Sequence, residues 1–73
     1  MVEIREIGKP KHDVIYIWDI LMRSWILTIK DAKDRLVKLA KKDGSKKVEI
    51  DYEKREIRFD GKTIFKFEYF YWV

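Results

Sequence analysis

The chain has 73 residues, no cysteine and a formal net charge of +4, and 41% of its residues are charged while 15% are aromatic. Disulfide bonds and cysteine-ligated zinc are therefore excluded, and the length predicts one small domain, residues 1–73. Because so short a chain buries only about 60% of its unfolded surface, aromatic packing, ion pairs or self-association must supplement its core.

The composition is typical of proteins that work at high temperature. The chain contains no Asn and no Gln, whereas Lys, Glu, Ile and Arg are abundant. Few thermolabile residues together with many charged ones is the pattern of heat-adapted proteins. Chance or deliberate design of the sequence would produce the same absence.

The chain shows no membrane or secretion signal. The longest apolar stretch, residues 14–27, is interrupted by Asp19, Arg23 and Ser24. We therefore expect no helix with the roughly 18 apolar residues that cross a membrane. The N-terminal residues lack the basic-then-apolar order of a signal peptide, so a cytoplasmic location is the expectation.

Two strands joined by a turn are predicted near the N-terminus. Residues 2–7 partly alternate between apolar and charged side chains, and residues 8–11 contain the turn formers Gly8 and Pro10. Residues 14–18 are β-branched and aromatic, which favours a central strand buried on both faces. These strands form an N-terminal strand pair, and the turn would allow them to join as a hairpin.

Residues 19–27 allow two interpretations. The preferred one continues the strand to about Ile20 and follows it with a connection. The alternative is one long helix that starts near Asp13 or Asp19, because apolar residues recur at helical spacing. Those residues are Trp18, Leu21, Trp25, Ile29, Ala32 and Leu36.

An amphipathic helix over residues 29–43 is the clearest element. Thr28 followed by Asp31 resembles a capping box at its start, and Gly44 is placed to end it in a left-handed conformation. Lysines in the last turns suit the negative end of the helix dipole. The apolar stripe of the helix consists of Ile29, Ala32, Leu36, Leu39 and Ala40.

The C-terminal part, residues 47–72, predicts a three-stranded antiparallel meander, so the fold class is α+β. We expect the helix to cover one face of the sheet. A two-residue loop at 53–54 would align cross-strand pairs of matching character. Those pairs are Val48 with Phe59, Glu49 with Arg58 and Ile50 with Ile57.

The turn at Asp60 and Gly61 sets the register of the last strand. A two-residue loop is the usual hairpin for this dipeptide, but it would place the aromatic face among charged residues. A three-residue loop, 60–62, instead aligns Ile57 with Phe65. One residue of register exchanges the two faces of a strand, so we predict an odd-length loop.

The last strand is apolar on both faces near its end. One face has Phe65, Phe67, Tyr69, Tyr71 and Val73, and the other has Ile64, Phe70 and Trp72. Such a strand is either central in the fold or covered by a partner. Aromatic residues on an exposed sheet can stack with unpaired bases, but for Phe65 and Phe67 we expect core packing under the helix.

A basic segment, residues 28–47, suggests nucleic-acid binding. It has eight Lys or Arg and three Asp, whereas the rest of the chain has nine basic and ten acidic residues. The candidate phosphate contacts are Lys30, Lys38, Lys41, Lys42, Lys46 and Lys47. The absence of Asn and Gln favours sequence-nonspecific binding. The alternative is a solvated helix in which Asp31 pairs with Arg35 and Asp34 with Lys38.

Large aromatic residues suggest an association surface. The candidate interface residues are Trp25, Phe70, Tyr71 and Trp72, and Trp18 belongs to the same excess of aromatics. Aromatics are enriched in interface cores, and a C-terminal strand could pair with its symmetry mate in a homodimer. The alternative is that all of them complete the core of the monomer.

Catalytic chemistry finds little support. The one histidine, His12, lies in a turn, the two serines are Ser24 and Ser45, and the three glycines are isolated. A positioned nucleophile or a glycine-rich phosphate loop is therefore hard to assemble, although a carboxylate pair formed across subunits stays open. We expect no enzyme activity, no cofactor, no metal site and no small-molecule substrate.

The sequence therefore favours a small non-catalytic interaction or self-assembling module, with a homo-oligomer or another protein as its partner. Sequence-nonspecific nucleic-acid binding through residues 28–47 is the alternative function.

Overall fold

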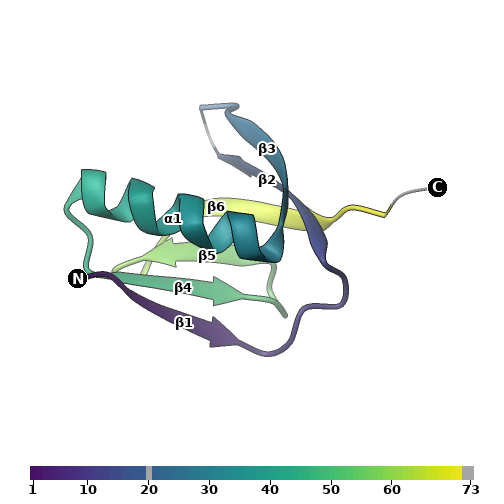
Figure 1. Ribbon diagram of the computed structural model, residues 1–73, viewed down its shortest axis with the longest axis horizontal. Coiled ribbons are helices and arrows are strands. Elements are labelled where there is room, and N and C mark those ends of the chain that lie inside the picture. The colour runs from purple at the N-terminus through teal and green to yellow at the C-terminus, as the bar shows by residue number, and fades with distance from the viewer. Residues whose placement is uncertain (20, 72–73) are drawn as a thin grey trace.

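The computed structural model describes residues 1–19 and 21–71, which form one sheet covered on one face by a helix (Figure 1). The sheet order is β1-β4-β5-β6-β2-β3. The pair β1 and β4 is parallel, whereas the other neighbours are antiparallel, so the sheet is mixed. The α+β class is confirmed. The elements are β1 (Glu3–Ile7), β2 (Val14–Asp19), β3 (Ser24–Thr28), α1 (Ile29–Asp43), β4 (Lys47–Asp51), β5 (Glu56–Phe59) and β6 (Lys62–Tyr69).

The two N-terminal strands are present, but they do not pair with each other. β1 forms one edge of the sheet beside β4, and β2 lies between β6 and β3. Next to β6, β2 places Ile17 opposite Phe67, and both side chains are fully buried. β1 has a less continuous apolar face and lies at the edge, where Ile4 pairs with Val48. The hairpin across the Gly8 turn was therefore wrong, because burial of the more apolar strand decided the order.

Residues 19–27 contain a strand that the sequence did not predict. β2 ends at Asp19, and β3 returns antiparallel to it, so the long-helix alternative is wrong. The predicted end near Ile20 falls outside the described residues. The apolar residues that suggested a helix also fit a strand here, because burial alternates along β3. Trp25 and Leu27 face the helix, while Ser24 and Ile26 are exposed.

Helix α1 has the predicted boundaries and caps. The hydroxyl of Thr28 accepts a hydrogen bond from the amide of Asp31 at 3.2 Å. Gly44 adopts φ 78°, which ordinary residues avoid, and ends the helix. Ala32, Leu36 and Ala40 are buried against the sheet. The apolar stripe thus acts as expected, and α1 covers one face of the sheet.

The register of β4 and β5 is confirmed. Glu49 pairs with Arg58 and Ile50 with Ile57, although the connection is a four-residue turn, 52–55. The carboxylate of Asp51 accepts hydrogen bonds from the amides of Glu53 and Lys54, both at 3.0 Å. A side chain that caps its own turn in this way is a common use of Asp.

The predicted odd-length loop before β6 was wrong. Phe59 pairs with Lys62, so the loop contains the two residues Asp60 and Gly61, with φ values of 50° and 84°. Two positive φ values suit the mirror-image turn that matches the twist of a hairpin. The register shifts by one residue further along, and Ile57 still lies opposite Phe65. The sequence argument relied on an odd-length loop to bring the apolar side chains of the last strand into the core. In the structure, a β-bulge has this effect instead.

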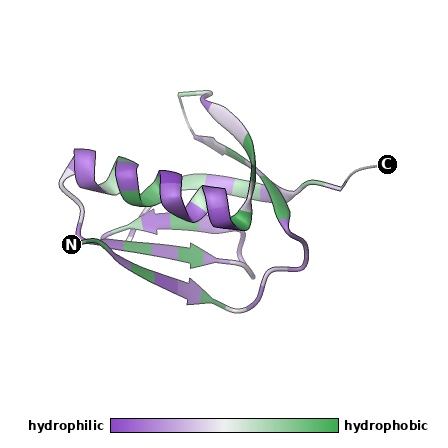
Figure 2. Cartoon of the chain, in the orientation of Figure 1, coloured by the Kyte–Doolittle hydropathy of each residue, from purple (hydrophilic) through white to green (hydrophobic). Residues whose placement is uncertain are grey.

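The core lies between α1 and the sheet. Hydrophilic and hydrophobic residues alternate along the strands (Figure 2). Phe65 and Phe67 are fully buried, which confirms that they pack in the core, and β6 is central between β5 and β2. No described element covers the other face, which we call the open face. The expectation that residues 14–18 are buried on both faces was therefore wrong, because Tyr16 remains 38% exposed there.

Candidate interaction surfaces

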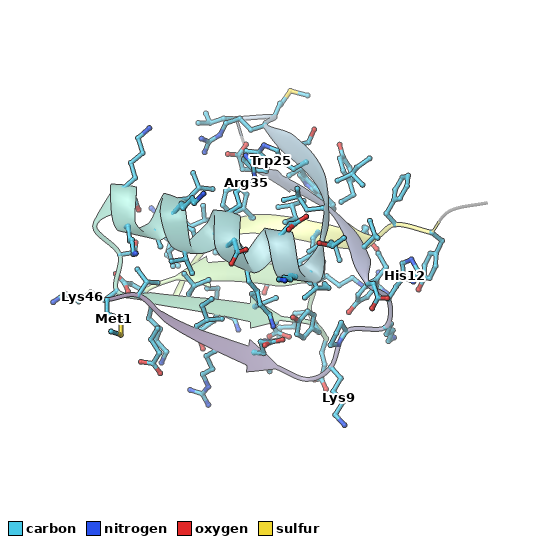
Figure 3. The ribbon with its side chains drawn as sticks, in the orientation of Figure 1. Met1, Lys9, His12, Trp25, Arg35 and Lys46 are labelled. Carbon is cyan, nitrogen blue, oxygen red and sulfur yellow. The ribbon has the colours of Figure 1, made fainter. Side chains whose placement is uncertain are left out.

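Trp25 lies on the helix side of the sheet, half buried between β3 and α1. Its ring meets Phe65 edge to face, with 5.7 Å between the ring centroids. The guanidinium carbons of Arg35 and Arg23 lie 5.4 Å and 5.9 Å from the ring centroid. Figure 3 shows Trp25 beside Arg35 in the space between the hairpin and the helix. Trp25 is therefore largely occupied by contacts within the chain.

The C-terminal candidates lie beyond the end of β6. The amide of Phe70 donates a hydrogen bond to the carbonyl of Val14 at 2.9 Å. Tyr71 is 57% exposed and its ring lies 4.5 Å from that of His12, whereas Trp72 lies outside the described residues. β5 and β2 occupy both sides of β6. Pairing of that strand with a symmetry mate was therefore a wrong expectation for residues 62–69.

β3 is an open edge with no charged side chain. Its sequence is Ser-Trp-Ile-Leu-Thr, and β2 is its one neighbour in the sheet. Hydrogen bonds from Asp19 N to Arg23 O and from Ile29 N to Asp13 O lie at the two ends of the pairing between β2 and β3. The alternation of an antiparallel pair then directs the backbone groups of Ser24 and Ile26 away from β2. This edge can accept another strand.

Apolar side chains gather beside this edge on the open face. We call Tyr16, Trp18, Met22 and Ile26 the hairpin patch. The rings of Tyr16 and Trp18 are 5.5 Å apart, and Ile26 pairs with Tyr16 across the strands. Met22 and Ile26 are exposed, and a hollow of about 330 Å³ lies between Trp18, Met22 and Glu68. The sequence argument missed this patch because it assigned both faces of residues 14–18 to the core.

Asp19 and Arg23 brace the turn of the hairpin that carries the patch. The buried carboxylate of Asp19 accepts hydrogen bonds from the amides of Leu21 and Arg23, both at 3.0 Å. It also pairs with the Arg23 guanidinium at 2.7 Å. Burial opposes ionisation of Asp19, but the Arg23 side chain and these amides together lower its pKa.

The opposite edge, β1, is charged and tied to the helix. Glu3, Arg5 and Glu6 are exposed. The carboxylate of Glu6 pairs with Lys33 of α1 at 2.7 Å and accepts a hydrogen bond from the Tyr52 hydroxyl at 2.6 Å. The Lys33 bond and then the Tyr52 bond lower the pKa of Glu6. Burial, and then the Glu6 carboxylate, raises the pKa of Tyr52.

The carboxylates on the rest of the open face are neutralised by arginines. Arg58 lies 3.1 Å from Asp51 and also approaches two glutamates, Glu49 at 3.7 Å and Glu56 at 3.4 Å. Arg55 pairs with Glu68 at 2.7 Å. The Lys54 amide bond, and then the Arg58 side chain, hold the pKa of Asp51 low against the effect of burial. This half of the face is thus a network of paired charges.

The basic segment keeps its lysines in solvent. Among the described residues, the expected ion pairs of Asp31 with Arg35 and Asp34 with Lys38 are absent. Lys33 is the helix cation that does pair, with Glu6. Four helix lysines and Lys46 are exposed, whereas Lys47 is half buried in β4. The four are Lys30, Lys38, Lys41 and Lys42.

His12 is half buried against Tyr71, and among the described residues its Nε2 finds no hydrogen-bond partner. Within residues 1–19 and 21–71, no group of three or more His, Cys, Asp or Glu is placed to hold a metal ion. In the same part of the chain, α1 is too short and too polar to span a membrane. No family model, curated protein or solved structure matches this chain.

Proposed function

We propose that this chain is a non-catalytic, self-associating interaction module whose β3 edge pairs with the β3 edge of a second copy. One observation carries the proposal: β3 is an uncharged open edge, and it lies beside the exposed hairpin patch. Natural sheets blunt their free edges with charges, prolines or bulges. An edge that lacks charged side chains beside apolar surface is suited to strand pairing.

A two-fold axis near Ile26 accounts for the contacts of such a dimer. Antiparallel pairing about this axis would satisfy the outward amide and carbonyl groups of Ile26 with the same groups of the partner's Ile26, and it would place Ser24 opposite the partner's Thr28. Ile26 is 49% exposed in the single chain, and it would meet its own counterpart across the axis. The two hairpin patches would then form one apolar surface on the open face.

The other edge favours a closed dimer over an open chain of subunits. Pairing of β3 with β1 of the next copy would bring the apolar strand against the exposed charged residues Glu3 and Arg5. An isologous contact between two β3 edges avoids this and closes on itself. The charged β1 edge thus supports a symmetric dimer, in which the partner is a second copy of the chain.

Analytical ultracentrifugation across a wide concentration range tests the proposal. We expect a reversible monomer–dimer equilibrium for the native chain. Ile26→Lys should raise the dissociation constant by at least about 100-fold, because two buried isoleucines are lost and two like charges meet. The fold should survive, since Ile26 is half exposed, and circular dichroism verifies this.

Arg5→Glu is the matched control, because Arg5 is an exposed residue of the other edge strand. It should leave the dissociation constant unchanged. A native chain that stays monomeric at the highest concentration would overturn the proposal. So would a folded Ile26→Lys variant that dimerises as well as the native chain.

A further inference from the structure

A groove separates α1 from the β2–β3 hairpin on the side opposite the hairpin patch. It consists of two hollows of about 400 and 470 Å³ that share Leu39. Arg23, Lys42 and Asp43 line the first hollow, and the partly exposed side chains of Leu39 and Ile64 form its apolar floor. We call these two hollows the helix–hairpin groove.

Basic side chains from two separate elements meet at this groove. Arg35 and Lys38 line the second hollow from α1, so four cations border the groove. We call Arg23, Arg35, Lys38 and Lys42 the cationic rim. Arg23 comes from the hairpin, whereas the other three come from the helix. The candidate phosphate contacts named from the sequence did not include the two arginines. Arg35 was a partner for Asp31 in the alternative interpretation, and the hairpin that carries Arg23 was not predicted.

Trp25 positions the two arginines of the rim. The guanidinium carbons of Arg35 and Arg23 lie 5.4 Å and 5.9 Å from its ring centroid. Arg23 is also held by Asp19, whereas no ion pair engages Arg35 in the described part of the chain. A guanidinium packed against an aromatic ring loses little freedom on binding, and its fork of N–H donors matches a phosphate.

The C-terminal half of the groove is the more basic one, because Arg23 and Lys42 there face one carboxylate, Asp43, whereas two cations and two carboxylates line the other half. Asp31 and Asp34 line the hollow near the start of α1. Towards the end of the helix, the carboxylate of Asp43 accepts a hydrogen bond from the Ser45 hydroxyl at 3.3 Å. Lys41 adds a further exposed cation there. An extended anion should therefore follow the last turns of α1 and avoid the first.

We infer that the helix–hairpin groove binds single-stranded nucleic acid, with phosphates on the cationic rim and a base on the apolar floor. Single strands offer both partners, because their bases are free to leave the stack and pack on apolar or guanidinium surfaces. Duplex bases are not available to such a floor. Recognition would be independent of sequence, since the chain has no Asn or Gln with which to read adenine edges.

Fluorescence anisotropy with labelled single-stranded oligonucleotides of mixed sequence tests the inference. Four phosphate contacts predict a slope of about −2.8 for log affinity against log salt, or a loss of about 50-fold between about 50 and 200 mM salt. The double variant Arg35→Glu with Lys42→Glu should bind at least about tenfold more weakly, and its slope should fall to about −1.4.

Lys54→Glu with Lys66→Glu is the matched control. It changes the net charge equally, and both lysines are exposed and lie away from the groove. The control should keep the native affinity within about twofold, since exposed charges further apart than a Debye length are largely screened. Equal losses in the two double variants would overturn the inference, because the effect would then reflect net charge alone.

Four further outcomes are decisive. Bound oligonucleotide should change the fluorescence of Trp25, so the signal should persist in Trp18→Phe and disappear in Trp25→Phe. Poly-glutamate that competes as well as the oligonucleotide, or an absence of binding at low salt, would overturn the inference. The Ile26→Lys variant should bind normally, which separates this site from the proposed dimer contact.

Discussion

β1 and β3 are the outermost strands of the sheet, and each has five residues. Three of the five residues of β1 are charged, and Glu6 ties this strand to α1 and to Tyr52. β3 has no charged residue, and its exposed Ile26 continues into the aromatic pair of Tyr16 and Trp18. Charged residues therefore protect the β1 edge of the sheet, whereas the β3 edge has no such protection.

The difference supports the proposal that the β3 edge is used for association. Leaving an edge unprotected invites aggregation, so it is tolerated where the contact closes on itself. Asp19 and Arg23 hold the β3 hairpin in a defined shape, which favours one mode of pairing over many. In the proposed dimer, the charged β1 edge would oppose growth of the sheet in the other direction.

Removal of the charges on β1 should have the largest effect. The double variant Glu3→Thr with Arg5→Thr leaves Glu6, which is bound to Lys33 and Tyr52, as the one charged residue of β1, so subunits can add at either end of the sheet. We expect growing, polydisperse assemblies in place of a defined dimer, measured by dynamic light scattering. Glu3→Lys, which keeps an edge charge, is the control and should retain the native size. A double variant of the same discrete size would contradict this account of β1.

Loss of the Asp19 carboxylate should weaken the other edge selectively. In Asp19→Ala the amides of Leu21 and Arg23 and the Arg23 guanidinium lose their acceptor. We expect faster hydrogen exchange across β2 and β3, with little change in β1 and β4, and weaker dimerisation. Uniform loss of protection through the whole sheet would show that the hairpin is not a separate unit of stability.

Acid should produce a smaller, graded effect on both edges. Hydrogen bonds and ion pairs lower the pKa values of Glu6 and Asp51, and they lower the pKa of Asp19 despite its burial. A carboxyl group whose pKa is lowered by folding stabilises the fold at pH values above its pKa in the unfolded chain, which is about 4. This contribution is lost as the pH falls further. The melting temperature should therefore be steady from neutral pH to about pH 5 and decline below it.

The variant Glu6→Gln isolates the part of this acid effect that belongs to β1. It should cost about 1 kcal/mol at neutral pH, because the partly exposed Lys33 ion pair is lost and the hydrogen bond from Tyr52 goes to a neutral amide oxygen in place of a carboxylate. The same variant should lose less stability than the native chain on acidification. An identical decline in the two proteins would assign the acid effect to other carboxylates.

Of the candidate sites, the sequence identified part of the groove and missed the edge. Lys38, Lys42 and Trp25 were already candidates from the sequence, since charge and aromatic content are visible in any sequence. Tyr16 and Arg23 were not, because their exposure depends on which strand lies beside β2. Trp25 was assigned to an interface, but the structure places it between the two arginines.

By itself the sequence determined the helix from Ile29 to Asp43, its caps and the register of β4 with β5. These features depend on residues close together in the chain, where spacing and turn chemistry suffice. The parallel pairing of β1 with β4, the bulge before Phe65 and the open edge at β3 were decided by the tertiary structure. They follow from competition among distant strands for the face that is buried under α1. The result of this competition cannot be inferred from a local sequence pattern.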